Sequence, residues 1–306
     1  MPEYLRPDVY VQRKSDSAPP IEAVGTATAG MIGAFRRGKP NEPMLVTSWS
    51  DFVRKTAKGL STPFIENSDA VYSAYNFFQN GGTRLFVDRV VGTGASKASA
   101  DIGDTDTVTI EAVTVGDWGN NITVDVEENA DNTSNYDITI YIEGEQVEKF
   151  ENLSTTSGDD NYFIDIINDE DDGSEHVFIA DDTGTLVTQT GTALEGGDSD
   201  LSSLSDTDYS DALKDFDTVD IVSILAIPGQ STKAVQQGLI DYCSNRGDVF
   251  AVIDSASGLD VTTAKENKLE LAGNYGAYYY PWVKMIDPLS DSGGKRLVPP
   301  SGFVMG

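Results

Sequence analysis

The chain contains one histidine, His176, and one cysteine, Cys243, so any catalytic arrangement that needs either residue must use these two. His176 follows the acidic run DEDDGSE, which is typical of a solvated turn, and we expect it on the surface at the start of a strand. Cys243 lies in the apolar pattern LIDYCSNRG, where a free cysteine usually packs as a small core residue. The two residues cannot supply the three or four nitrogen and sulfur ligands of a zinc site.

A run of acidic residues at 169–172 is the strongest candidate for binding a metal ion, because its spacing before Gly173 is similar to that of an EF-hand loop. Counted from Asn168 as the first position, Gly173 falls at the sixth but Ile179 falls at the twelfth. An EF-hand needs a bidentate glutamate at the twelfth position. We therefore expect a solvated acidic turn here, with adventitious calcium binding as the alternative.

Glycine-rich and aromatic segments could also bind ligands. GGT at 81–83 and GTG at 92–94 match neither the P-loop nor the dinucleotide fingerprint, and we interpret them as a helix stop and a turn. The tyrosines at 278–280 and Trp282 could stack on sugars or bases, but they lie in an otherwise apolar strand. We expect these aromatics in the core or at an interface, and we expect no catalytic residue, metal or cofactor.

Charge is the strongest feature of the composition. The 306 residues include 50 acidic and 21 basic residues, which gives a formal net charge of -29. Such a surface repels phosphate, so we expect neither nucleic acid nor an anionic membrane as a partner. Acidic, lysine-poor surfaces suit high salt, which leads to the hypothesis of a halophilic source. The sequence has no apolar run of about eighteen residues and no secretory signal, so we expect a soluble protein that is not exported.

Residues 1–24 have the pattern of an extended arm. The alternating stretch Val9, Tyr10 and Val11 is followed by the polar, proline-bearing run SDSAPP. Such a segment cannot form a compact unit alone, so we expect it to pair with a partner.

Residues 25–91 alternate between strand and helix patterns, which favours an α/β layer. The expected elements are a strand in VGTATAGMIGAF, a short strand in MLVTS, a helix from the cap Ser50-Asp51 to about Lys58, a helix from the cap Asn67 or Ser68 to Asn80-Gly81-Gly82, and a strand in TRLFVDRVV.

Residues 92–217 are rich in Asp, Thr, Ser, Asn and Gly, and their apolar residues form short alternating runs such as VTIEAV, ITVDV, YDITIYI and HVFIA. We interpret this region as an inserted, mostly-β domain with its own small core. Its last part, GTALEGGDSDLSSLSDTD, has few apolar residues, and we expect a flexible return linker.

Residues 218–306 resume the α/β pattern. DIVSILAIPG and DVFAVIDS predict strands, TKAVQQGLIDYCSNRG predicts a helix closed by Gly247, and TTAKENKLELAG predicts another helix. The final VPPSGFVMG shows no closing helix or strand, which indicates an interruption. The predicted fold is therefore an α/β core domain, residues 25–91 and 218–306, with a β-rich insertion and an N-terminal arm.

Several segments together resemble the sheath proteins of contractile tails, found in tailed viruses and related injection particles. Each segment is weak alone, but they follow the order of that family and span residues 6 to 302. They are RPDVYVQ at 6–12, PIEAVGTAT at 20–28, VTSWSDF at 46–52, FFQNGGTR at 77–84, DWGNNI at 117–122, and YYPWVKMIDP at 279–288 with VPPSG at 298–302.

The resemblance implies a structural subunit that polymerises into a contractile tube around an inner tail tube and drives it through a target envelope. It implies copies of the same chain, the inner tail tube protein, and baseplate and tail terminator proteins as partners, with a location in the virion tail or in an injection particle. In that family the terminal arms thread into neighbouring subunits, so it implies that Val9, Tyr10 and Val11 add a strand to another copy, as exposed sheet edges allow.

Two departures from the family pattern are present. Asp8 replaces the usual glycine, and the domain that normally follows P-P-S-G is absent, which leads us to expect a shortened chain. A cell-surface or carbohydrate-binding adhesin, with the β insertion as its recognition module, is the alternative. A hydrolase that depends on His176 is a distant third.

Overall fold

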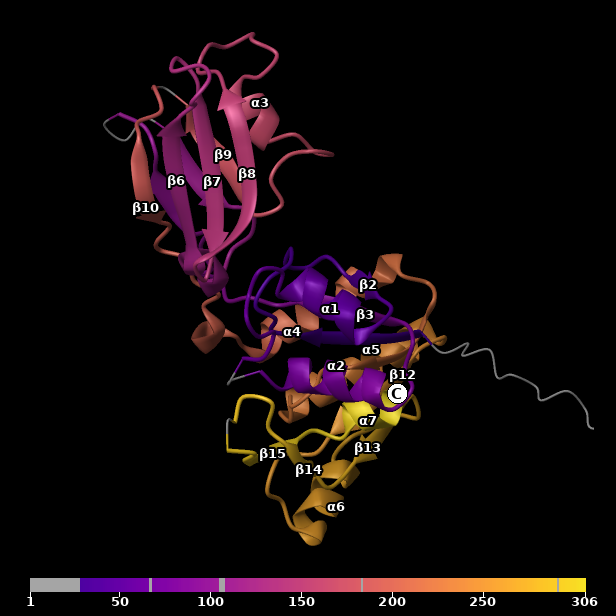
Figure 1. The fold of residues 1–306 in the computed structure, drawn as a ribbon. Helices are drawn as coiled ribbons and strands as arrows, with labels where there is room; N and C mark the ends of the chain where they lie inside the picture. Colours follow the sequence, from indigo (N-terminus) through magenta and orange to yellow (C-terminus); the bar gives the residue numbers. More distant parts are fainter. Residues whose placement is uncertain (1–27, 66–67, 105–107, 183, 291) are drawn as a thin grey trace, which may run out of the picture.

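A six-stranded sheet with the order β13-β12-β11-β1-β3-β2 organises one region of the computed structural model, which describes residues 28–65, 68–104, 108–182, 184–290 and 292–306 (Figure 1). Neighbouring strands are parallel except β2, which pairs antiparallel with β3 at one edge. The strands are β1 Thr28–Gly33, β2 Met44–Val46, β3 Leu85–Arg89, β11 Val222–Ala226, β12 Phe250–Asp254 and β13 Gly276–Tyr279.

Helices cover both faces of this sheet, which confirms the α/β class. One face packs on α1, α2 and α7 through a core that includes Met31, Phe52 and Tyr72. The other face packs on α4, the 3-10 helix η3 and α5 through a core that includes Ile32 and Phe216. The helices are α1 Trp49–Thr56, α2 Asp69–Gln79, α4 Asp206–Ala212, η3 Leu213–Thr218, α5 Lys233–Arg246, α6 Val261–Leu269 and α7 Ser301–Met305.

Helix ends follow local chemistry closely. Gly247 adopts a φ of 79° at the end of α5, as predicted, because glycine enters the left-handed region without a steric cost. Ser68 is the N-cap of α2, but its hydroxyl donates to the carbonyl of Ala34 at 2.6 Å instead of capping the helix. The predicted cap of α1 at Ser50-Asp51 is wrong, because Ser48 is the N-cap and accepts a hydrogen bond from the amide of Asp51.

Two antiparallel sheets form the other region of the molecule (Figure 1). One has four strands in the order β10-β6-β7-β8, and the other has three in the order β4-β5-β9. A single hydrophobic cluster, which includes Trp118, Val124, Ile140 and Phe163, packs between them. The elements are β4 Ser99–Asp101, β5 Val108–Ala112, β6 Ile122–Glu128, β7 Tyr136–Ile142, β8 Glu145–Leu153, α3 Phe163–Ile167, β9 Val177–Asp182 and β10 Gln189–Ala193.

The segment that we predicted to be a flexible return linker is instead structured. β10 pairs with β6, and Leu194 is fully buried. The capping box of Ser205 and Asp208 then starts α4, whose Tyr209 packs into the core of the six-stranded sheet. Side-chain capping and a few large apolar residues therefore order a segment whose average composition is polar.

The end of the chain also differs from the prediction. β14 Val283–Ile286 and β15 Lys295–Val298 form an antiparallel hairpin, and α7 follows, so the statement that VPPSGFVMG contains no closing helix is wrong. Within the described residues no helix is long and apolar enough to cross a membrane.

Candidate functional site

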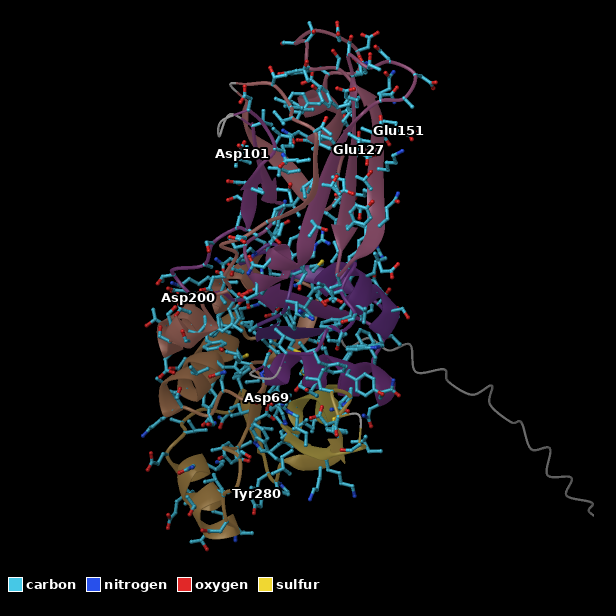
Figure 2. The ribbon with its side chains drawn as sticks, turned by 60° about the vertical axis from the view of Figure 1, so that its left-hand side comes forward. Asp69, Asp101, Glu127, Glu151, Asp200 and Tyr280 are labelled. Atoms are coloured by element: carbon cyan, nitrogen blue, oxygen red, sulfur yellow. The ribbon has the colours of Figure 1, made fainter. Side chains whose placement is uncertain are left out.

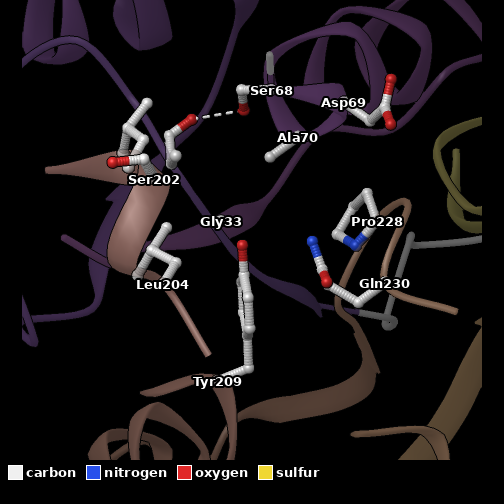
Figure 3. Close-up of a pocket in the computed structure, with 11 residues that line it drawn as sticks. Gly33, Ser68, Asp69, Ala70, Ser202, Leu204, Tyr209, Pro228 and Gln230 are labelled. Carbon is white, nitrogen blue, oxygen red and sulfur yellow. Dashed lines mark hydrogen bonds between the residues drawn. The ribbon is translucent and has the colours of Figure 1, made fainter. Parts of the chain in front are cut away.

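A cavity of about 300 Å³ lies at the carboxyl ends of β1 and β11, where the chain order reverses along the sheet (Figure 3). In open α/β sheets this is the usual position of a ligand crevice. The cavity is lined by Gly33, Ala34, Ser68, Asp69, Ala70, Leu201, Ser202, Leu204, Tyr209, Pro228 and Gln230.

Two polar side chains that line this cavity, Ser68 and Asp69, form hydrogen bonds within the protein. Asp69 accepts a hydrogen bond from Arg296 at 3.2 Å, and burial raises the pKa of Asp69 while the guanidinium opposes that shift. Burial also raises the pKa of Tyr209 to about 12. The lining residues include no histidine, cysteine, lysine or arginine. The hydroxyl of Ser68 donates to a main-chain carbonyl and Asp69 binds Arg296, so these two neighbours are not paired as a nucleophile and its base.

The C-terminal hairpin is anchored to α2 at the same edge of the sheet. Arg296 extends from β15 to Asp69, and its guanidinium lies 4.3 Å from the ring centre of Tyr72. The hydroxyl of Tyr72 donates to Asp287, which follows β14, at 3.3 Å. A cation held between a carboxylate and an aromatic face fixes the position of the hairpin.

Asp254, at the end of β12, fixes the start of α7. It accepts hydrogen bonds from the amide and hydroxyl of Ser301 at 2.8 and 2.7 Å and from the amide of Gly229 at 3.2 Å. Burial raises the pKa of Asp254 to about 6, and the bonds from Ser301 limit that shift. A Cβ on Gly302 would lie 2.3 Å from the carbonyl oxygen of Ser73, so glycine lets α7 approach α2. The VPPSG segment therefore serves as an anchor.

The aromatic segment lies at the sheet edge beside α6. A groove of about 430 Å³ is bounded by Tyr278, Tyr280 and the apolar side of α6, including Val261 and Leu269. Trp282 donates to the carbonyl of Ser255 at 2.6 Å. Tyr278 and Tyr279 are half-buried and pack against the cores on the two faces of the six-stranded sheet, while Tyr280 is exposed in the groove.

His176 is not on the surface, which corrects our expectation: its exposed fraction is 1%. Its Nδ1 lies 2.8 Å from Nη1 of Arg37, which follows β1, and the guanidinium of Arg37 also stacks over Trp118 at 4.3 Å. Burial, Arg37 and Lys58 lower the pKa of His176 to about 3, so its ring is neutral. The prediction failed because an acidic, hydrophilic run preceded a residue that packs against the other region of the molecule.

Arg89 was missed in the sequence and has a similar position. It donates to the carbonyls of Phe35 and Val115 at 2.8 and 2.9 Å and to the hydroxyl of Ser199 at 3.2 Å. Three segments that are distant in sequence therefore bind one buried cation at the end of β3: Phe35 follows β1, Val115 follows β5 and Ser199 follows β10. No sequence pattern distinguishes this arginine from an exposed one.

The remaining candidates have structural environments. Cys243 is fully buried, and burial raises the pKa of its thiol to about 12, as expected for a core residue. In the turn after α3, Asp169 accepts amide hydrogen bonds from Asp171 and Asp172. Among the residues that the structure describes, no group of three or more His, Cys, Asp or Glu side chains could hold a metal ion. Val9, Tyr10 and Val11 lie outside the described residues.

Solved structures with the same fold include two sheath tail proteins. The sheath tail protein of Listeria innocua is 18% identical, with a TM-score of 0.64 over 91% of this chain and 54% of that protein. The sheath tail protein of Desulfitobacterium hafniense is 15% identical, with a TM-score of 0.63 over 97% of this chain and 61% of that protein. This chain therefore spans 54% and 61% of their lengths. No family model and no curated protein matches the chain.

Proposed function

We propose that this chain is a structural subunit of a contractile tail sheath, which polymerises around an inner tail tube and drives that tube through a target envelope. The observation that carries the proposal is the fold shared with two sheath tail proteins over 91% and 97% of this chain. The work of such a subunit comes from a difference between two packings of rigid bodies, not from bond chemistry.

The residues of the sheath-like segments support a structural role, because they hold elements together. Ser301 and Gly302 dock α7, as described above. In DWGNNI, Trp118 packs under Arg37, and the amide side chain of Asn120 exchanges hydrogen bonds with the main chain of Gly197 at 2.8 Å.

We further propose that residues 1–24 form an arm in which Val9, Tyr10 and Val11 add a strand to a neighbouring copy. Thr28 opens β1 and pairs with Val222 at the amino edge of the sheet, so the preceding chain joins the body there. An extended segment gains main-chain hydrogen bonds when it pairs with an exposed strand edge.

In this proposal residues 25–91 and 218–306 belong to the sheath core, and the two antiparallel sheets within residues 92–217 form a domain that faces outward. The predicted boundary at 217 needs one correction, because α4 and η3 pack on the six-stranded sheet and belong to the core. Figure 2 shows Glu127 and Glu151 on the antiparallel sheets, at the opposite end of the molecule from Tyr280. Outward acidic side chains maintain solubility and make few contacts. The inner tail tube, baseplate and tail terminator proteins are the further partners that such a sheath requires.

Electron microscopy of the native particle tests the proposal. Striated tubes of two lengths that contain this chain are the expected result, and particles without tubes would contradict it. Deletion of residues 1–24 should abolish ordered tubes and leave the fold intact by circular dichroism. Unchanged assembly together with lost glycan binding would favour the adhesin instead.

A further inference from the structure

The exposed hydrophobic side chains of this protein are concentrated near its C-terminus. Of the twelve large hydrophobic residues that are exposed in the described ranges, eight lie between residues 261 and 304. The same region differs in charge from the rest of the chain, because residues 261–306 contain five of the 21 basic residues and only four of the 50 acidic ones. A surface that is apolar and not acidic, in a chain of charge -29, is typical of a contact surface.

The clearest part of this surface is the outer face of the hairpin. Lys284 pairs with Leu297 and Ile286 pairs with Lys295 across β14 and β15, so these four side chains share one face. Ile286 is 65% exposed and Leu297 is 45% exposed. Neither lysine forms an ion pair with another described residue. We call these four residues the hairpin face.

The hairpin face is held rigidly from behind. Arg296 binds Asp69 on the inner side, Met285 and Val298 pack into the core beside α2, and Ser301 is bound to Asp254. A partner that docks on the hairpin face therefore orders few additional groups, which lowers the entropic cost of association.

A complementary surface lies at the amino ends of β11 and β12 in the six-stranded sheet. Ile221, which precedes β11, and Phe250, which opens β12, are 52% and 39% exposed. Asp217 and Asp220 precede Ile221 and are exposed. Arg246 donates to the carbonyl of Val219, before β11, and to the carboxylate of Asp248, before β12, so it holds the two strand starts together. We call Asp217, Asp220, Ile221 and Phe250 the amino-edge patch.

The two surfaces lie at opposite ends of the strand direction. β12 begins with Phe250 in the amino-edge patch and ends at Asp254, which binds Ser301 just after the hairpin. Complementary surfaces at opposite ends of one body generate a head-to-tail contact, which produces a ring or a filament.

We propose that the hairpin face of one copy docks on the amino-edge patch of the next copy, with Lys284 and Lys295 opposite Asp217 and Asp220 and the apolar side chains between them. This inference rests on the proposed sheath function, because it assigns the contact by which the subunits join. Charge complementarity sets the orientation, and burial of the four apolar side chains supplies the affinity.

Charge reversal tests this contact in the full chain. Variant A carries Lys284→Glu and Lys295→Glu, and variant B carries Asp217→Lys and Asp220→Lys. Each variant alone places like charges across the contact, so its association constant should fall at least tenfold relative to the natural chain. An equimolar mixture of A and B restores opposite charges at every contact, so the mixture should associate as the natural chain does. Sedimentation velocity measures both, after circular dichroism shows that each variant is folded.

A matched control carries Lys39→Glu and Lys149→Glu, which change the net charge as variant A does but lie outside both surfaces; it should associate normally. If the natural chain associates and variants A and B each associate equally well alone, the head-to-tail contact is overturned while the sheath proposal stands. A mixture that fails to recover would also overturn the contact. A natural chain that stays monomeric at every concentration would contradict the sheath proposal itself.

Discussion

Nη1 of Arg37 lies 2.8 Å from Nδ1 of His176, across the boundary between the six-stranded sheet and the antiparallel sheets. The arginine is always charged and has only donors, so the histidine must accept at Nδ1 and carry its proton on Nε2. Glu148 lies 3.8 Å from that Nε2, and Arg37 also donates to the main-chain carbonyl of Glu175. This buried contact joins residues that are 139 positions apart.

Replacing His176 by alanine should destabilise the protein by about 2–3 kcal/mol, because a buried guanidinium would lose an acceptor. His176→Gln supplies an amide oxygen in the same region, so it should cost less than half as much. Urea unfolding at pH 7 compares the two variants with the natural chain. Equal losses for both variants would show that packing volume, not the hydrogen bond, is the contribution of His176.

The same histidine should make stability fall with acid. Its pKa is about 3 when folded and 6.5 when unfolded, so the unfolded chain binds the proton first. The stabilisation is complete above pH 6.5 and is lost as the pH falls toward 3, with a slope of about 1.4 kcal/mol per pH unit. We expect the advantage of the natural chain over His176→Gln to shrink between pH 7 and pH 4. A constant difference in unfolding free energy would contradict this prediction.

The sequence predicted those elements whose signals are local. The end of α5 at Gly247 and the burial of Cys243 follow from left-handed glycine and apolar periodicity, which act within a few residues. The α/β class of the core also followed from the alternation of these elements. The sequence therefore predicted most of the six-stranded sheet.

The failures at His176 and in the return segment have one physical origin, which is contact between distant segments. His176 is buried by Arg37 and Trp118, which are remote in sequence, and the return segment is ordered because β10 finds β6. The sequence singled out the aromatic segment at 278–280 as a core or interface element. It could not identify the hairpin face, because that surface depends on the register between β14 and β15. Local composition carries no information about such pairings.

Asp254 should produce the opposite pH dependence. Its folded pKa of about 6 lies above the ordinary value of 3.8, so the folded state favours the protonated acid. Its contribution to stability is present at low pH and is lost as the pH rises through about 6. Asp254→Asn keeps an acceptor oxygen and does not titrate. Between pH 5 and 7 the natural chain should lose stability relative to this variant, measured by urea unfolding, and a relative gain would refute the assignment.

Gly302→Ala should destabilise the protein by about 1–3 kcal/mol, because the new methyl group would meet the backbone of Ser73. The sign is informative, since glycine to alanine normally stabilises a helix. Val304→Ala in the same helix is the control, because Val304 is 39% exposed and should change stability by less than about 0.5 kcal/mol. Thermal melting ranks the two variants, and a stabilised Gly302→Ala would show that α7 does not pack closely on α2.

High salt should stabilise this protein. A formal net charge of -29 on 306 residues repels itself in the compact state, and salt screens that repulsion with a Debye length of about 3 Å at molar concentration. The melting temperature should therefore be higher in molar than in millimolar KCl. The variant Glu170→Gln, Asp171→Asn, Asp172→Asn removes three exposed charges and should show a smaller increase. Equal melting temperatures in the two salts would remove the hypothesis of a halophilic source, because the acidic surface would then have no measurable effect on stability.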